Sequence, residues 1–462
     1  MSKLLAYDDV NIVPKYSELV SRKRVNLNTK LTKTLNIKIP IVSSPMDTVT
    51  EYDMALEMMS LGGVGVIHRF MSIKEQSDIV KKLNLNKKLW GQFISENVTL
   101  ENEVDSMFAY AGTIIGSKTK PLEEYTLKEW KFLLDETLDN HPITLHLSAT
   151  RSYYRKIFKL KFGHDVDLDY FDVHKRQIDL NSIKVSKQKL KLIKDFYKSM
   201  KSLQENISKL PICAAIGVKG DYLERAEELV KNGCNVLLID VAHGHHKYVG
   251  EAIEEIKTKL SGVEVIAGSV ATAEATEYLC EKGADSIRVG IGNGSLCETR
   301  IRTGVGIPQV SAIRDCVAVA DDFSTPVIAD GGVRDIGDVC KGLGCGADTI
   351  MLGSLLSGTK ESPGEIEKVG KWPNEQLYKK YRGSASLDSK KSRGDNKNVE
   401  GNHKVIPYKG KVKRILRDIQ EGLCSAFSYV GANNISEYHS KVELIEVTSA
   451  GNIEGKPHLL DT

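Results

Sequence analysis

The sequence lacks the features that mark several classes of protein. No apolar run approaches the roughly 20 residues that a membrane helix needs, and the stretch from Met1 to Lys15 lacks the apolar core of a signal peptide. The eight cysteines are scattered, with no CxxC pair and no zinc-like cluster. This spacing favours reduced thiols over disulfides or a metal site. We therefore expect a cytoplasmic protein that is not bound to a membrane.

The chain also lacks an excess of charge of one sign. It carries 64 basic and 61 acidic residues, a formal net charge of +3, which gives no overall argument for binding nucleic acid. Hydrophobic residues make up 41% of the 462 residues, enough to bury a full core. This length suits one large barrel with an additional module.

What the sequence does contain is a series of short apolar runs that alternate with helical patterns. Each run is followed within a few residues by glycine or a polar loop, as in a parallel sheet buried on both faces. The runs begin at Ile39, Val64, Pro211, Val236, Val263, Ser286, Pro326 and Thr349. Eight strands is the number that closes a barrel, and no GxGxxG motif follows the first strand. The sequence therefore predicts an α/β fold of the (β/α)8 TIM-barrel type.

Residues 86–210 differ from both flanks in composition. They are poor in glycine and rich in lysine, and Ile183, Leu190 and Ile193 stand at helical spacing. We expect a mostly helical insertion after the second strand, serving either as a regulatory or interaction module or as a solvated structural element. Aromatic residues among the basic ones leave RNA stacking as a weaker alternative to a small helical core.

Residues 375–410 form a second atypical segment. They are polar and without clear periodicity, and they follow the last strands of the predicted barrel. Long loops in this place are often functional, so we expect a lid over the catalytic face. The chain then divides into a first part of the barrel at 1–85, the insertion at 86–210, and the remaining barrel with its lid at 211–462.

The segment from Val289 to Arg300 carries the densest chemical signal. Its three glycines allow a tight turn and offer backbone N–H groups to an anion, and Ser295 adds a hydroxyl. Cys297 then stands on a loop at the carboxyl end of a predicted strand, where barrel enzymes place catalytic groups. Beside these dipoles and near Arg300, Cys297 is a candidate thiolate nucleophile. The alternative is an inert, buried thiol.

Two later strands end in glycine and polar residues. One ends at Asp330 and Gly332, and the next ends at Gly353 and Ser354. Consecutive late strands of a barrel commonly bind a phosphate through backbone N–H groups. Because Asp330 would repel a phosphate, we expect it to accept hydrogen bonds from ribose hydroxyls. The alternative is a pair of tight turns without a ligand.

Residues 1–85 and 211–462 resemble the family of IMP dehydrogenases and GMP reductases. The matching stretches are Asp8-Asp-Val, Ser44-Pro-Met-Asp-Thr-Val, Gly65-Val-Ile-His-Arg, Asp240-Val-Ala-His-Gly-His, Gly292-Asn-Gly-Ser-Leu-Cys-Glu-Thr-Arg, Thr303-Gly-Val-Gly-Ile-Pro-Gln, Ala329-Asp-Gly-Gly, Met351-Leu-Gly-Ser and Tyr381-Arg-Gly. The resemblance implies that the thiolate of Cys297 adds to C2 of a purine nucleotide. A nicotinamide cofactor then gives or takes hydride at that carbon.

The resemblance also assigns roles to individual residues. It implies catalytic roles for Cys297, Thr299 and Glu400, with Thr299 pairing with the lid carboxylate. The nucleotide would contact Ser44, Met46, Ser295, Asp330, Gly332, Gly353, Ser354, Tyr381, Gly383 and Ser384. The cofactor would contact Asp240, Ala242, Gly290 and Gly292. A monovalent cation such as K⁺ at Gly292, Gly294 and Cys297 is left open, and a homotetramer is expected.

The direction of the reaction depends on the lid. The dehydrogenases of this family carry an Arg-Tyr pair that activates water, and no such pair occurs between Tyr381 and Tyr408. Glu400 acting through Thr299 would supply a proton to a leaving amine. We therefore expect a GMP reductase, which converts GMP to IMP and ammonia with NADPH.

Two alternatives to the reductase stay open. The first is an IMP dehydrogenase that uses NAD, which the segment at Ile67-His-Arg and the place of the insertion favour. The second is a purine-nucleotide-binding regulator without turnover. Two departures from the family pattern are Ser384, which replaces a Met, and Glu298, which replaces a neutral residue. The carboxylate of Glu298 would raise the pKa of the Cys297 thiol unless it points away.

The composition of the insertion leads to a first prediction. Replacing residues from about Asn86 to Leu210 with a short linker should leave a folded, active barrel, because inserted modules usually begin and end close together. Expression, solubility and turnover of the shortened chain provide the measurement. Loss of soluble protein would mean that the insertion completes the core of the barrel.

Overall fold

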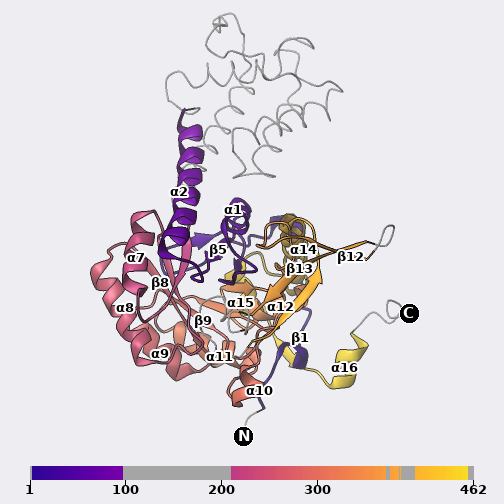
Figure 1. The fold of residues 1–462 in the computed structure, drawn as a ribbon. Coiled ribbons are helices and arrows are strands. Elements are labelled where there is room, and N and C mark those ends of the chain that lie inside the picture. Colours follow the sequence, from indigo (N-terminus) through magenta and orange to yellow (C-terminus); the bar gives the residue numbers. More distant parts are fainter. Residues whose placement is uncertain (1–2, 97–209, 371–374, 384–385, 387–400, 456–462) are drawn as a thin grey trace, which may run out of the picture. The chain divides into compact units, whose positions relative to one another are not determined.

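The computed structural model describes residues 3–96, 210–370, 375–383, 386 and 401–455. Its centre is a closed barrel of eight parallel strands (Figure 1). The strands are β4 (Ile41–Ser43), β5 (Val64–Ile67), β6 (Cys213–Ile216), β7 (Val236–Ile239), β8 (Glu264–Val270), β9 (Ser286–Val289), β10 (Val327–Asp330) and β11 (Thr349–Leu352). The predicted (β/α)8 barrel is confirmed, and each predicted run overlaps one of these strands.

Helices cover the outside of the barrel, which is why its strands are apolar on both faces. They are α1 (Tyr52–Ser60), the part of α2 (Ile73–Glu96) up to Asn84, α7 (Tyr222–Lys231), α8 (Lys247–Lys259), α9 (Ala273–Glu281), α11 (Gln309–Ala320), α12 (Ile336–Gly344) and α14 (Val412–Val430). The short helix α10 (Thr299–Thr303) follows the loop after β9 and buries none of its residues. Side-chain caps fix several starting points. Thr272 accepts a hydrogen bond from the backbone of Ala275 at 3.2 Å, and Asp335 accepts one from Asp338 at 2.9 Å.

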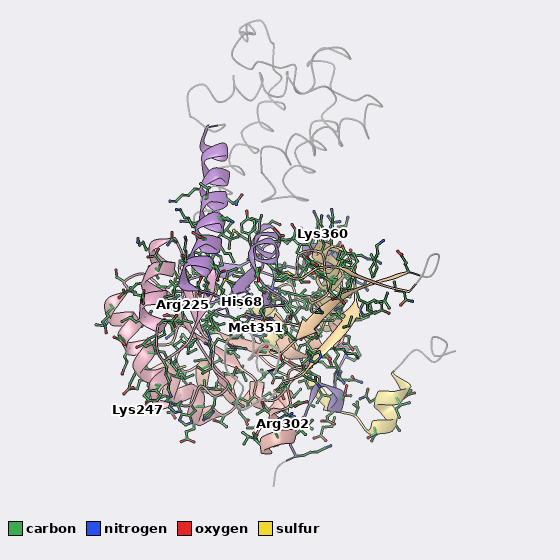
Figure 2. The ribbon with its side chains drawn as sticks, in the orientation of Figure 1. His68, Arg225, Lys247, Arg302, Met351 and Lys360 are labelled. Carbon is green, nitrogen blue, oxygen red and sulfur yellow. The ribbon has the colours of Figure 1, made fainter. Side chains whose placement is uncertain are left out.

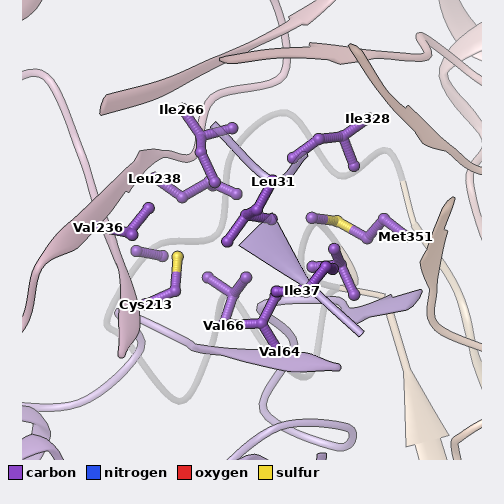
Figure 3. Close-up of a cluster of buried hydrophobic side chains, with 12 residues drawn as sticks. Leu31, Ile37, Val64, Val66, Cys213, Val236, Leu238, Ile266, Ile328 and Met351 are labelled. Atoms are coloured by element: carbon purple, nitrogen blue, oxygen red, sulfur yellow. The ribbon is translucent and has the colours of Figure 1, made fainter. Parts of the chain in front are cut away.

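A short hairpin before the first barrel strand closes the amino end of the barrel. It consists of β2 (Thr29–Lys30) and β3 (Asn36–Ile37), and its Leu31 is fully buried among side chains of the surrounding strands (Figure 3). The hairpin bonds to residues at the start of strands, since Thr29 donates to the carbonyl of Asp348 and Lys33 to that of Asp285. With this end closed, a ligand can enter the barrel from the carboxyl ends of the strands.

Smaller sheets lie outside the barrel. The predicted lid overlaps an antiparallel sheet of β12 (Glu367–Val369), β13 (Gln376–Arg382) and β14 (His403–Pro407). Near the termini, η1 (Tyr7–Asp9) leads into β1 (Val10–Ile12), which pairs with β15 (Leu444–Glu446). The remaining elements are η2 (Arg22–Arg24), α15 (Ile435–Lys441) and α16 (Ser449–Glu454). Among the described residues, none of the helices combines the length and apolarity required to cross a bilayer.

The chain divides into two compact units, one of residues 1–84 with 211–462 and one of residues 85–210. Residues 97–209 lie outside the described part of the chain, so the helical character and the role of the insertion stay predictions. The interruption falls between β5 and β6, the second and third strands of the barrel. Near its ends, Lys87 Nζ donates to the carbonyl of Leu210 at 2.8 Å. A short linker can therefore join the two sides.

Candidate active site

A cavity of about 630 Å³ opens at the carboxyl ends of the barrel strands. Its lining comes from the loops after β4, β5, β7, β9, β10 and β11, together with the ends of β8 and β13. The predicted site residues that line it are Ser44, Met46, Asp240, Ala242, Gly290, Gly292, Gly294, Ser295, Cys297, Thr299, Asp330, Gly332, Gly353, Ser354, Tyr381 and Gly383. Ser384 and Glu400 lie outside the described residues. The structure therefore brings the described candidates together, while their individual roles stay predictions.

Cys297 lies on the loop between β9 and α10, partly buried at the cavity wall. Its Sγ–H group donates to Thr299 Oγ1 at 3.1 Å, and its backbone N–H donates to the carbonyl of Gly294 at 3.0 Å. Gly290 has a φ of +147°, and an added Cβ there would lie 1.9 Å from the carbonyl oxygen of Asp330. Only glycine allows the loop to start this close to the end of β10.

The end of the lid contacts the Cys297 loop through backbone hydrogen bonds. Gly401, the residue after Glu400, forms an antiparallel bridge with Cys297. Asn402 donates its backbone N–H to the carbonyl of Leu296 at 3.0 Å, and Gly383 donates to the carbonyl of Asn402 at 2.9 Å. These bonds hold the parts of the lid around Gly383 and Asn402 beside the Cys297 loop.

The unusual carboxylate of Glu298 is turned toward Arg302. Its Oε2 accepts a hydrogen bond from Arg302 Nε at 2.6 Å, and its Oε1 accepts one from Asn402 Nδ2 at 3.4 Å. The negative charge is thus paired along helix α10 instead of being directed at Cys297. Glu298 therefore joins α10 to the end of the lid.

On the other side of the cavity, polar groups surround an open space next to Gly353. Ser295 Oγ and the Tyr381 hydroxyl lie 3.1 Å apart, and burial raises the pKa of Tyr381. Ser44 Oγ is buried without a hydrogen-bond partner among the described residues. A Cβ on Gly353 would lie 3.1 Å from Ser44 Oγ and 3.4 Å from the Tyr381 hydroxyl. A glycine at this position keeps the space open for a ligand with hydrogen-bonding oxygens.

The loop after β11 is oriented by a lysine. Lys409 Nζ donates to the carbonyls of Ser354 at 2.6 Å and Leu355 at 3.3 Å. Because carbonyl and N–H point in opposite directions across a trans peptide, the N–H of Leu355 is directed away from Lys409. Such an arrangement leaves backbone donors for an anion.

Sequence reasoning missed the charged group at the centre of the cavity, Arg288. Its Nε donates to Asp330 Oδ2 at 2.8 Å and its Nη1 donates to Asp240 Oδ1 at 2.9 Å. Only 12% of its side chain is exposed. Burial acts to lower the pKa of Arg288, but the two carboxylates outweigh burial and raise it. Arg288 is therefore a permanent cation that orients both carboxylates.

A signal for Arg288 was present in the sequence. It is the one charged residue in the apolar run Ser-Ile-Arg-Val at 286–289, and a charge in a buried strand needs a charged partner. Arg69, Ser269 and Asn293 also line the cavity and were not predicted. Arg69 ends the matching stretch Gly65-Val-Ile-His-Arg and Asn293 stands in the Cys297 segment, so both had a signal in the sequence. Ser269 lies within β8 and has no such motif.

Comparisons with known proteins extend over nearly the whole chain. Residues 4–458 match the model of the IMP dehydrogenase / GMP reductase domain. Among similar proteins, inosine-5'-monophosphate dehydrogenase from Nitrosopumilus maritimus is 35% identical over 98% of this chain and 98% of its own length. The enzymes of that name from Aquifex aeolicus and Helicobacter pylori (strain 26695) are each 37% identical, over 98% and 100% of this chain and 95% and 97% of their own lengths.

The expectation of a GMP reductase is wrong. The relatives named here, at 35% to 37% identity over almost their full lengths, are all IMP dehydrogenases. The preference for NADPH rested on the same expectation and loses its support. The error came from giving a short lid segment more weight than the rest of the chain. Most of that segment, residues 387–400, lies outside the described part.

The central position of Arg288 gives a prediction about stability. Arg288→Met removes the cation between two partly buried carboxylates, so the free energy of unfolding should fall by about 3–5 kcal/mol. Urea unfolding followed by circular dichroism measures this change.

Arg302→Met is the matched control for that experiment. Arg302 lies at the periphery of the barrel (Figure 2), with half of its side chain exposed, and it pairs with Glu298. Its loss should cost less than about 1 kcal/mol. If the two substitutions had equal effects, the buried cation would not be what keeps Asp240 and Asp330 in place.

Proposed function

The chain belongs to the IMP dehydrogenase / GMP reductase family of purine-nucleotide oxidoreductases, and on that premise we propose that it is an IMP dehydrogenase. The reaction converts IMP, NAD⁺ and water to XMP, NADH and a proton. The observation that carries the proposal is the pair Cys297 and Thr299, whose Sγ and Oγ1 lie 3.1 Å apart at the wall of the cavity. Similarity to IMP dehydrogenases along almost the full chain supports the direction.

We assign the space next to Gly353 to the phosphate of IMP. The unpartnered Ser44 Oγ, the Ser295 hydroxyl and the Tyr381 hydroxyl all border it. Backbone N–H groups of Gly353 and Ser354 would add donors. Gly332 would line the turn beside the nucleotide, with its own N–H bonded to the carbonyl of Asn293 at 2.8 Å. Asp330, held by Arg288, would accept hydrogen bonds from the ribose, and Met46, Gly383 and Ser384 would contact the base.

In this arrangement the thiolate of Cys297 forms a bond to C2 of the purine. Hydride then leaves C2, and the purine remains attached to sulfur as a thioimidate. Water next attacks C2 and the C–S bond breaks, which releases XMP and restores the thiolate. Thr299 Oγ1 accepts the Sγ–H hydrogen bond and would pass the thiol proton on as the sulfur bonds to C2. N3 gains a proton in that addition and releases it when hydride leaves C2, which gives the thioimidate.

The hydrolytic step needs a base, and the lid has no Arg-Tyr pair to provide one. We propose that Thr299, together with Glu400, takes up the proton of the attacking water. Thr299 lies beside the sulfur that carries the purine, and Gly401 next to Glu400 pairs with Cys297. Thr299 and Glu400, first expected to donate a proton to a leaving amine, would thus accept a proton from water.

The cofactor NAD⁺ would occupy the part of the cavity near Asp240 and Ala242, where it would accept the hydride from C2. Arg69 Nε lies 3.7 Å from Asp240 Oδ2 and Arg288 Nη1 lies 2.9 Å from Asp240 Oδ1, so the Asp240 carboxylate is held in place and would accept further hydrogen bonds from ribose hydroxyls. Gly290 and Gly292 would allow close approach of the nicotinamide ring. A monovalent cation at Gly292, Gly294 and Cys297, and a homotetrameric assembly, stay predictions on which no step depends.

The proposal is tested by following reduced nicotinamide and XMP in parallel. The purified protein should form both from IMP and NAD⁺, and should not oxidise NADPH in the presence of GMP. Cys297→Ala should lower kcat by about 10³-fold or more, with the Kd for IMP nearly unchanged because phosphate and ribose contacts remain. Substantial XMP formation by Cys297→Ala would exclude the covalent route. Binding of IMP without turnover by the wild type would favour the regulator.

The phosphate assignment is tested by Gly353→Ala. The new methyl group would fill the space between Ser44 and Tyr381, so KM for IMP should rise about 10-fold, the equivalent of about 1.4 kcal/mol of lost binding. Gly451→Ala in α16 is the control, since its added Cβ lies at least 3.6 Å from the nearest atoms. An unchanged KM in Gly353→Ala would place the phosphate elsewhere.

A further inference from the structure

Next to the Cys297 loop, three polar side chains form one connected hydrogen-bond network. Arg300 Nη2 donates to Asn293 Oδ1 and to the carbonyl of Ile307, and Asn293 Nδ2 donates to Gln309 Oε1. Gln309, with 2% of its surface exposed, donates its Nε2 to the carbonyls of Val289 at 2.9 Å and Asp330 at 3.2 Å. The network therefore joins the Cys297 loop to the ends of β9 and β10.

The side chain of Arg300 occupies a slot between two glycines. A Cβ on Gly292 would lie 2.7 Å from Arg300 Cγ, and a Cβ on Gly306 would lie 2.5 Å from Arg300 Nε. Both glycines have positive φ, +77° and +153°, so the backbone follows a path that other residues rarely adopt. The loop on both sides of Cys297 is thus built closely around this one side chain.

Arg300 is placed to fix the loop before and after the thiol. It belongs to α10, whose first residue is Thr299, and its guanidinium bonds to Asn293 before Cys297 and to the backbone of Ile307 after it. Arg300 is not among the described residues that line the cavity, whereas Cys297 and Thr299 are. Arg300 can therefore act on the reaction through the geometry of the loop or through its positive charge, but not by contact with the ligand. Arg300→Lys, which keeps the charge, separates these two effects.

We propose that Arg300 is a positioning residue that holds the Cys297 thiol beside Thr299 and toward the purine C2. The proposal rests on the proposed function only in taking Cys297 as the nucleophile. A fixed planar guanidinium with several donors can satisfy Asn293 and Ile307 together, which a shorter or single-donor side chain cannot do in the same geometry. Without Arg300 the loop loses the link between its two ends, and the thiol becomes more accessible but less well aligned.

The network also connects the thiol to the turn assigned to the ribose. Besides the bond from Gln309 to Asp330, the backbone N–H of Gly332 donates to the carbonyl of Asn293 at 2.8 Å. The ribose turn has independent support from the pairing of β10 with β9 and β11. Replacing Arg300 should therefore change the position of the Cys297 thiol much more than the affinity for the nucleotide.

Arg300→Gln tests the proposal by two independent readouts. For turnover of IMP with NAD⁺, kcat should fall about 10-fold or more through misalignment of the reacting atoms, while KM for IMP stays within about threefold. For the thiol, limited alkylation with iodoacetamide is followed by mass spectrometry. Modification of Cys297 relative to Cys424, the other partly exposed cysteine, should rise about threefold or more because exposure increases.

Arg314→Gln is the control, because Arg314 is an exposed arginine of α11 and is not among the described residues that line the cavity. It should keep both kcat and the alkylation ratio within about twofold of the wild type. Arg300→Lys, which retains the charge, should give an effect in the same direction but smaller. If Arg300→Gln does not fold, Arg300→Lys and Asn293→Ser are judged by the same criteria.

Two results would overturn the positioning role. One is a kcat for Arg300→Gln close to that of the wild type, and the other is an unchanged ratio of Cys297 to Cys424 modification. If the wild type did not oxidise IMP at all, the proposed function would fail. The alkylation ratio would still decide whether Arg300 holds the thiol, so the two failures are distinguishable.

Discussion

Closure of the barrel between β11 and β4 is the constraint on which the rest of the structure depends. Ile350 pairs with Ile41 and Leu352 with Ser43, so all eight strands run in the same direction and end at the same face. Closure gives every barrel strand a hydrogen-bonded neighbour on both sides, so no strand edge is left open. The strands are then buried between the outer helices and the interior of the barrel. Because Leu31 and the β2–β3 hairpin close the amino end, the polar loops collect at the opposite end around one cavity.

Within that cavity, geometry and charge are fixed by different means. Backbone contacts at Gly290 set the distance between the Cys297 loop and the end of β10. Arg288 sets the charge, since it bridges Asp240 and Asp330 and keeps both carboxylates oriented. The thiol and its proton acceptor Thr299 then lie on a loop that is held from both sides. In the proposed reaction, little reorganisation would be needed for the thiolate to reach the purine, and such an arrangement favours catalysis by preorganisation.

Much of the fold and the location of the site could be predicted from the sequence. Apolar runs such as Val236–Ile239 identified each strand, and the Cys297 loop with the Asp330 and Gly353 turns defined the cavity, because both signals are local. Arg288 was missed because its role depends on Asp240 and Asp330, which are far from it in the sequence. The burial of Leu31 at the amino end of the barrel was also missed. The strands on either side of it, β2 and β3, have two residues each and are too short to show a periodic pattern.

The direction of the reaction was predicted incorrectly for a related reason. The absent Arg-Tyr pair was given decisive weight, but in the proposed reaction the same Thr299 that would protonate an amine would accept a proton from water. A proton relay has no intrinsic direction, and the reaction is set by which leaving group and nucleophile occupy the site. Resemblance over the whole chain was the better guide to that choice than one segment of the lid.

The pairing of β4 with β11 also has a consequence for biosynthesis. β4 ends at Ser43 and β11 begins only at Thr349, so the first barrel strands leave the ribosome long before their partner exists. Until β11 emerges, β4 and β5 present an unpaired apolar edge, which is the kind of surface that promotes aggregation of nascent chains. The segment between β5 and β6 lengthens that interval. Folding of the barrel is therefore completed late in synthesis, and chaperones that shield exposed strand edges should bind nascent chains that end before β11.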